Sequence, residues 1–336
     1  MRIRWWISWL PICIVLAGCT QAVESRRVLK LAHGLDVSHP VHLAMDSMAR
    51  HVARISAGAL QVAVYPNEQL GTERQCLELL QLGSLDMTKV SAAVLENFAP
   101  NLQVLGLPYI FSDKTHYHHV ADGPIGQALL DEGVQYWLKG LVFYDAGSRS
   151  FYTKDRPIRT PADLKGMKIR VMNSVTAMSM IREMGGSPTP ISFGELYTAL
   201  QQGVVDGAEN NPPSFLTARH YEVCKYYSLD EHTSVPDVLL ISTHSWARLA
   251  PQEQAWLLEA ARASVPYQRH LWEQQEAEAL AIVREAGVEV IYPEKQPFQA
   301  SVDAILGSYN DQPGMRAYIQ QIRDAMPAAA PDTLAR

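Results

Sequence analysis

Two arginines in this chain have the residue type and setting that suit an anion. In the run Lys168–Asn173, apolar and charged side chains alternate, as in a strand with one buried face. Arg170 points away from the apolar face, and its planar guanidinium offers the two-donor fork that suits a carboxylate. Arg149 follows a predicted strand at 142–144 and a turn at Gly147. For a single arginine a surface salt bridge is the commoner explanation, but together the two suggest an anion site in a protein with a net charge of −6.

The composition argues against several other kinds of chemistry. Hydrophobic residues make up 47% of the 336 residues, as in a globular protein, and 29 basic against 35 acidic residues give no sign of a nucleic-acid partner. The motifs G-x-S-x-G, H-E-x-x-H, G-x-x-x-x-G-K-[ST] and C-x-x-C are absent from the sequence, which disfavours an enzyme. His116, His118 and His119 could supply metal ligands from one helix, but we favour a solvated helix because no acidic pair completes a site. We expect neither a metal nor a cofactor.

The segments that position the arginines alternate between strand and helix patterns. The first set has strands at 28–32, 60–65 and 85–90 and helices at 41–56 and 73–82. The second set has strands at 169–171, 188–191 and 204–208 and helices at 176–184 and 194–202. Both contain Leu-Gln-x-Gly-x-x-Asp, at Leu80–Asp86 and Leu200–Asp206, where glycine ends a helix before a strand. We interpret Asp86 and Asp206 as turn residues without a ligand role.

Two similar α/β units predict a cleft between two lobes. Ligands of open α/β sheets bind beyond the carboxyl ends of the strands. The candidates that follow each repeat are therefore Lys89, Val90 and Ser91 in one unit and Glu209, Asn210 and Asn211 in the other. A further helix pattern runs from Pro251 to about Ala286, long enough at roughly 50 Å to cross both units. Pro266 predicts a kink or a break within it.

The first residues have the pattern of an export signal. Arg2 and Arg4 precede an apolar stretch, and Leu-Ala-Gly-Cys19 resembles a bacterial lipobox. We expect a lipoprotein signal peptide at 1–18 and acylation of Cys19, which would anchor the protein to the membrane; ordinary cleavage near Ala22 is the alternative. Cys76 and Cys224 then remain in the body, more plausibly as buried thiols than as a disulfide. We expect residues 326–336 to form a flexible tail.

Several longer runs resemble the periplasmic solute-binding proteins of TRAP transporters, of the DctP type. The matching runs include Tyr65–Gly71, Gly83–Met87, Leu107–Phe111, Thr160–Val171, Phe193–Asn210 and Tyr221–Val223. The resemblance covers nearly all of residues 28–300. It implies an α/β fold of two lobes with a hinge and a long helix spanning both, which captures organic acids in the periplasm and delivers them to a membrane permease. It also implies lobe I at 25–146 plus 236–275 and lobe II at 147–235 plus 276–325.

The resemblance also implies roles for individual residues. Arg170 matches the arginine that pairs with the ligand carboxylate, Arg149 a supporting arginine, and Asn210 the asparagine of the Asp-Gly-x-Glu-Asn motif. The remaining matches are Phe193 as a wall of the pocket, Glu73 as an acidic group facing ligand hydroxyls, and Asn173 and Ser91 as ligand-side positions.

Departures from the common pattern bear on the ligand. The form Glu-Asn-Asn-Pro-Pro, with Asn211 added, and the runs Tyr226–His232 and Val235–Asp237 look like the subgroup that binds hexuronates. Extra amides and histidines suit a polyhydroxylated acid, and His33 could join them or be structural. A C4-dicarboxylate or small keto acid is the alternative ligand, and an enzyme acting on a sugar acid is the alternative of another class. We expect a monomer.

Overall fold

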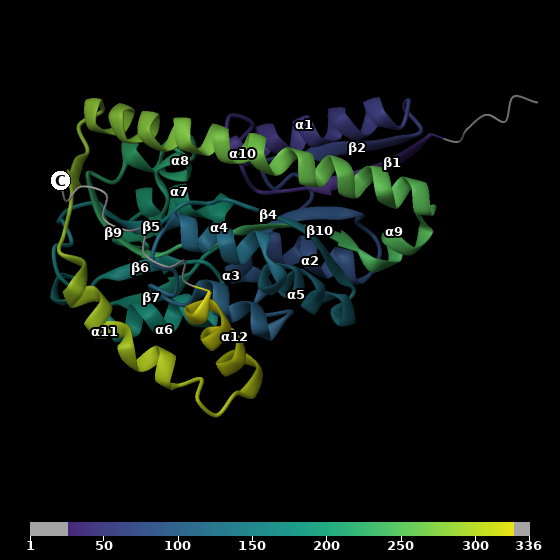
Figure 1. Ribbon diagram of the computed structural model, residues 1–336. Coiled ribbons are helices and arrows are strands. Elements are labelled where there is room, and N and C mark those ends of the chain that lie inside the picture. Colours follow the sequence, from purple (N-terminus) through teal and green to yellow (C-terminus); the bar gives the residue numbers. More distant parts are fainter. Residues whose placement is uncertain (1–25, 326–336) are drawn as a thin grey trace, which may run out of the picture.

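The computed structural model describes residues 26–325, which form two β-sheets covered by helices (Figure 1). The first sheet has the order β2 (Leu60–Tyr65), β1 (Arg27–Ala32), β3 (Met87–Ser91), β10 (Asp237–Ser242) and β4 (Leu138–Tyr144). The second sheet has the order β11 (Glu289–Ile291), β9 (Tyr226–Thr233), β5 (Arg149–Thr153), β8 (Gly207–Asn210), β6 (Lys168–Val171) and β7 (Ser187–Pro190). The predicted signal peptide at 1–18, the lipidation site Cys19 and the tail at 326–336 lie outside the described residues.

Twelve α-helices and four 3-10 helices connect these strands in the described part of the chain. The α-helices are α1 (Pro40–Ile55), α2 (Glu73–Gln81), α3 (Ala92–Leu95), α4 (Lys114–Asp122), α5 (Pro124–Glu132), α6 (Val175–Glu183), α7 (Phe193–Gln201), α8 (Pro212–Thr217), α9 (Thr243–Arg248), α10 (Pro251–Glu285), α11 (Lys295–Gly307) and α12 (Pro313–Asp324). The 3-10 helices are η1 (Pro100–Gly106), η2 (Gly133–Tyr136), η3 (Pro161–Leu164) and η4 (His220–Glu222). The α/β fold with two lobes is thereby confirmed.

The internal repeat has the same structure in both sheets. Gly83 and Gly203 end helices α2 and α7 with φ angles of 69° and 70°, which glycine adopts without strain. Asp86 then accepts a hydrogen bond from the backbone of Lys30 at 3.0 Å, and Asp206 accepts the equivalent bond from Lys168 at 2.7 Å. Both carboxylates therefore have the structural role that we predicted. The turns that contain them take up residues that we expected in the strands, so β3 and β8 begin later than predicted.

The chain passes between the two sheets at three places. Residues 145–148 connect β4 to β5, and residues 234–236 connect β9 to β10. The third crossing is the helix α10, which runs along both sheets at the top of Figure 1. Helix α12 lies within the segment 276–325, yet it contacts the first lobe, where Tyr318 donates a hydrogen bond to Glu132 at 3.0 Å.

Helix α10 is continuous through Pro266. The prediction of a break at this proline is therefore wrong. Proline removes one backbone hydrogen bond of a helix, at a cost of about 3 kcal/mol. Packing offsets this cost, because Ser264 bonds Tyr144 at 2.7 Å on one side of the proline. On the other side, the amide of Gln268 bonds both the N–H and the C=O of Asp145, at 2.9 and 2.8 Å.

The histidine cluster is not the solvated helix that we predicted. His116 is buried and its Nε2 lies 2.8 Å from the carbonyl of Ile322, so it joins α4 to α12. His118 lies 2.9 Å from the carboxylate of Asp145. Among residues 26–325, no three His, Cys, Asp or Glu side chains come together in an arrangement that could hold a metal ion.

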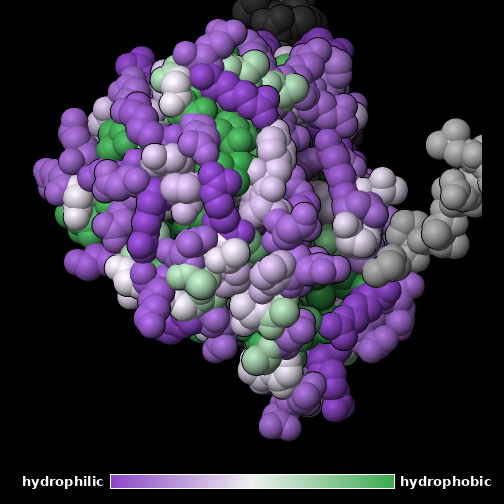
Figure 2. Space-filling model, turned by 90° about the vertical axis from the view of Figure 1, so that its left-hand side faces the viewer, coloured by the Kyte–Doolittle hydropathy of each residue, from purple (hydrophilic) through white to green (hydrophobic). Residues whose placement is uncertain are grey.

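The two cysteines of the described segment are both free and buried, as we predicted; they are Cys76 in α2 and Cys224 before β9. Between residues 26 and 325, no helix is both long enough and apolar enough to cross a membrane. Figure 2 shows that the end of the molecule on the left of Figure 1 is covered mainly by hydrophilic side chains, with hydrophobic ones in small separate patches. Such scattered apolar groups are normal on a protein surface.

Candidate functional site

A cavity of about 270 Å³ lies between the two lobes. Its volume is close to the lower end of the roughly 300–1,000 Å³ typical of small-molecule pockets. The residues that line it come from both lobes and include eight that we predicted to bind the ligand: Glu73, Ser91, Arg149, Arg170, Asn173, Phe193, Asn210 and Asn211. Of the other candidates, Lys89 also lines it, whereas His33, Val90, Glu209 and His232 do not. The fold therefore brings together residues that are far apart in the sequence.

Arg170 is placed by β6, between the parallel strands β7 and β8. It is 1% exposed, and its Nε donates a hydrogen bond to the carbonyl of Ile191 at 2.8 Å. Its Nη1 is buried and has no hydrogen-bond partner among the described residues, and no salt bridge of Arg170 is found there either. Burial lowers the pKa of this guanidinium, although arginine remains a cation. The cavity wall thus contains a positive charge whose donors the protein leaves largely unused.

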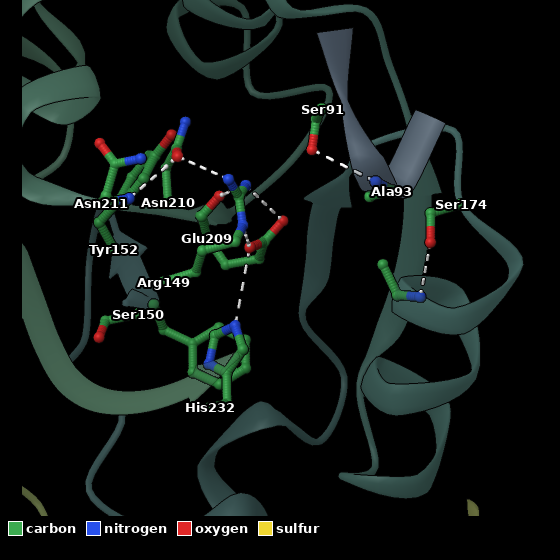
Figure 3. A network of polar contacts seen from close by, with 12 residues as sticks. Ser91, Ala93, Arg149, Ser150, Tyr152, Ser174, Glu209, Asn210, Asn211 and His232 are labelled. Carbon is green, nitrogen blue, oxygen red and sulfur yellow. Dashed lines mark hydrogen bonds and ion pairs between the residues drawn. The ribbon is translucent and has the colours of Figure 1, made fainter. Parts of the chain in front are cut away.

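Arg149, at the start of β5, has the opposite character because protein groups accept four hydrogen bonds from its guanidinium (Figure 3). Its Nε donates to one carboxylate oxygen of Glu209, and its Nη2 donates to the other at 3.0 Å and to the Glu209 carbonyl at 2.8 Å. Its Nη1 donates to the side-chain oxygen of Asn210 at 2.7 Å. Glu209 therefore compensates the charge of Arg149, which is consistent with a supporting role beside Arg170.

The ion pair extends away from the cavity through two further buried groups. The ring of His232 lies 3.6 Å from Glu209 Oε2 and 2.8 Å from Asp230 Oδ2. Burial lowers the pKa of His232, but the carboxylates of Asp230 and Glu209 outweigh it and raise the pKa to about 9. Burial raises the pKa of Glu209, but Arg149 and His232 outweigh it and lower the pKa to about 2. Two anions thus alternate with two cations, and the network holds Arg149 in place.

The sequence analysis missed the roles of Glu209, His232 and Asp230. We expected the histidine of the run Tyr226–His232 to suit the ligand, but His232 is fully buried and is not among the residues lining the cavity. The available signal was the charged residue Glu209 within the short strand Gly-Ala-Glu-Asn of β8, since a charge that is buried in a sheet requires a partner.

The two asparagines at the end of β8 have their side-chain oxygens engaged within the protein. Asn210 Oδ1 accepts from Arg149 and from the backbone of Asn211 at 2.9 Å. Asn211 Oδ1 caps helix α8 by accepting from the backbone of Ser214 at 2.8 Å. The amide NH2 groups are the parts of these side chains that suit a ligand oxygen.

The first lobe contributes a group of paired charges to the same cavity. Lys89 in β3 donates to Glu73 and to Asp237, both at 3.1 Å. Burial lowers the pKa of Lys89, but Asp237 and Glu73 outweigh it and raise the pKa, which keeps the ammonium charged. Glu73 also accepts from the backbone of Ser91 at 3.2 Å. The Lys89 ammonium is thus already paired inside the protein.

His33 is a predicted ligand-binding residue that does not line the cavity. It is 1% exposed, its Nε2 lies 3.0 Å from His42 Nδ1, and its Nδ1 accepts from the backbone of Leu35 at 3.1 Å. Burial lowers its pKa to about 2, so the ring is neutral. Of the two interpretations in the sequence analysis, the structural one describes these contacts, because His33 supports the loop whose Gly34 and Leu35 line the cavity.

Comparisons with known proteins agree with this fold. A TRAP periplasmic solute-binding protein from Xanthobacter autotrophicus Py2, solved with bound β-D-galacturonate, is 40% identical with a TM-score of 0.86, over 88% of this chain and 99% of that chain. One from Chromohalobacter salexigens DSM 3043, solved with bound D-glucuronate, is 34% identical with a TM-score of 0.86, over 88% of this chain and 99% of that chain.

Proteins of similar sequence also belong to the solute-binding class. A solute-binding protein of Chromohalobacter salexigens is 36% identical over 290 residues, which are 86% of each chain. The family of bacterial extracellular solute-binding proteins, family 7 (DctP), matches residues 31–312. This chain therefore belongs to the DctP family of bacterial extracellular solute-binding proteins.

Proposed function

We propose that this protein is the periplasmic receptor of a TRAP transporter for a hexuronate such as D-glucuronate or D-galacturonate. The observation that carries the proposal is the buried guanidinium of Arg170, which lines the cavity between the lobes without an ion-pair partner in the described residues. A buried charge without a partner is costly, so its presence in a cavity wall calls for an anionic ligand.

The ligands of the structural neighbours support the choice of a hexuronate. The Xanthobacter and Chromohalobacter proteins were solved with galacturonate and glucuronate. Their similarity to this chain covers almost the whole of both molecules, at 40% and 34% identity. These comparisons do not favour a C4-dicarboxylate, a keto acid or an enzymatic role.

In this proposal the second lobe holds the carboxylate and contacts the sugar ring. The fork of Arg170 pairs with the carboxylate, while the Arg149–Glu209 pair holds Asn210 at the cavity wall. The amide groups of Asn210 and Asn211 donate to ring oxygens, and Phe193 packs against the apolar face of the sugar. Closure of the lobes about 145–148 and 234–236, where we place their boundaries, then forms the surface that the permease recognises.

A thermal-shift screen tests the proposal with hexuronates, C4-dicarboxylates and small keto acids. A ligand at one hundred times its dissociation constant adds about 2.7 kcal/mol to the free energy of unfolding, which should raise the melting temperature by several degrees. A rise with hexuronates supports the proposal. A rise with malate or pyruvate alone would contradict it, as would conversion of the bound acid detected by mass spectrometry.

We also propose that Cys19 is acylated and anchors a monomeric receptor to the membrane on its periplasmic side. The support is the sequence Leu-Ala-Gly-Cys19 after an apolar stretch. Cys19→Ala should move the protein from the membrane fraction to the soluble periplasmic fraction. An unchanged distribution would contradict the anchor, and a dimer in light scattering would contradict the monomer.

A further inference from the structure

The charged groups of the cavity are distributed unequally between its two walls. On the second-lobe wall, Arg149 is compensated by Glu209, and Arg170 has no ion pair among the described residues. That wall therefore presents an unpaired positive charge. The first-lobe wall carries the acid–lysine–acid triad of Glu73, Lys89 and Asp237. Glu68 and Arg74 also line the cavity from this lobe, and the charge of Arg74 is compensated by Glu78 at 3.1 Å.

The backbone fixes the triad on one face of the first sheet. Lys89 and Ser91 alternate along β3 and so share a face, and Asp237 pairs directly with Ser91 across the two strands. Glu73 is the first residue of α2, where Thr72 caps the helix in a capping box. Two of the three donors of the Lys89 ammonium are engaged, since its Nζ lies 3.1 Å from one oxygen of each carboxylate, and the side chain is 2% exposed.

The triad contains two carboxylates and one ammonium, so its formal charge is negative. Its remaining carboxylate lone pairs can only accept hydrogen bonds, which suits the hydroxyl groups of a sugar. A second carboxylate of a ligand would meet two carboxylates there, in a cavity where water screens charges weakly. Repulsion between these like charges lowers the affinity for a ligand that has two carboxylates.

We propose that the Glu73–Lys89–Asp237 triad determines specificity by excluding a second carboxylate at the end of the ligand remote from Arg170, where the resemblance already implies that Glu73 faces hydroxyl groups. This inference rests on the proposed hexuronate function. The protein then distinguishes a hexuronate from the hexaric acid of the same stereochemistry, which differs from it by a carboxylate at the other end of the carbon chain. The triad thereby selects sugar monoacids against sugar diacids.

Isothermal titration of the full protein with matched pairs tests this proposal: D-glucuronate against D-glucarate, and D-galacturonate against galactarate. We expect the monoacid of a pair to bind roughly 100-fold or more tightly than the diacid, because like charges are brought together only in the diacid complex. Glu73→Gln and Asp237→Asn each remove one negative charge with little change of shape. Each should reduce the preference about tenfold, through tighter binding of the diacid.

Glu285→Gln is the control, because Glu285 is an exposed acid at the end of α10 that does not line the cavity. It should leave the preference unchanged. Diacid affinity within threefold of monoacid affinity in the unaltered protein would overturn the inference and leave the hexuronate function standing. An unchanged preference in folded Glu73→Gln would also overturn it, whether or not Asp237→Asn folds. Failure of both monoacids and diacids to bind would overturn the hexuronate function and the inference together.

Discussion

Replacing Arg170 by glutamine removes the positive charge that we assign to the ligand carboxylate. The side chain is buried, and among the described residues it has one hydrogen bond, from Nε to Ile191, and no salt bridge. Loss of one partner of a buried, hydrogen-bonded charge pair costs about 2–5 kcal/mol. At about 1.4 kcal/mol for each factor of ten, glucuronate affinity should fall by roughly 30-fold to several thousand-fold.

The same substitution should have little effect on the stability of the protein without ligand. Arg170 is a buried cation with an Nη1 that has no partner in the described residues, and burial lowers its pKa. Its removal relieves a desolvation cost of about 1–3 kcal/mol, which offsets the lost bond to Ile191. The free energy of unfolding of Arg170→Gln in urea should therefore equal or exceed that of the unaltered protein.

Arg149→Gln is the contrasting variant, since it leaves the carboxylate of Glu209 buried beside a shortened partner. Breaking a buried ion pair in this way typically costs about 3–5 kcal/mol of stability. Titration calorimetry and urea unfolding on both variants separate binding from folding. A folded Arg170→Gln protein whose glucuronate affinity lies within threefold of the unaltered one would refute the assignment of the carboxylate to Arg170.

Two further predictions concern the buried network and lobe closure. Because the pKa of His232 is raised from 6.5 to about 9, its contribution to stability is complete below pH 6.5 and is lost as the pH rises through 9. The stability difference between the unaltered protein and His232→Gln, measured in urea, should shrink over that interval; a constant difference would contradict it. Gly194 donates from its backbone to Glu68 of the other lobe at 3.2 Å, and an added Cβ would lie 2.4 Å from Glu68 Oε2. Because Glu68 would have to turn away and lose this hydrogen bond, Gly194→Ala should weaken glucuronate binding about tenfold, and unaltered affinity would contradict the closure contact.

The sequence predicted the elements that are defined by local signals. Glycines such as Gly83 and Gly203 mark helix ends, and the alternation around Arg170 marks a strand with a polar face. The strand starts were placed too early because the turns before β3 and β8 require additional residues. The break expected at Pro266 does not occur, since contacts with distant residues hold α10 together, and such contacts leave no mark in the local sequence.

The candidate residues that match a family pattern could be named from the sequence. The ion pairs between residues far apart in the sequence could not. Arg149 and Glu209 are adjacent only because β5 and β8 are antiparallel neighbours. The same holds for Lys89 and Asp237 in β3 and β10. Single-residue patterns do not reveal that one arginine of the cavity is compensated and the other is not. That distinction required the pairing of the strands.

The crystal structure of the protein with bound D-glucuronate is the most direct test of the central claim. We expect the sugar in the cavity between the lobes, with its carboxylate oxygens within hydrogen-bond distance of the Arg170 guanidinium. We expect hydroxyl groups at its other end beside Glu73 and Asp237. A carboxylate bound to Lys89 with Arg170 facing only water, or a sugar outside this cavity, would contradict the account.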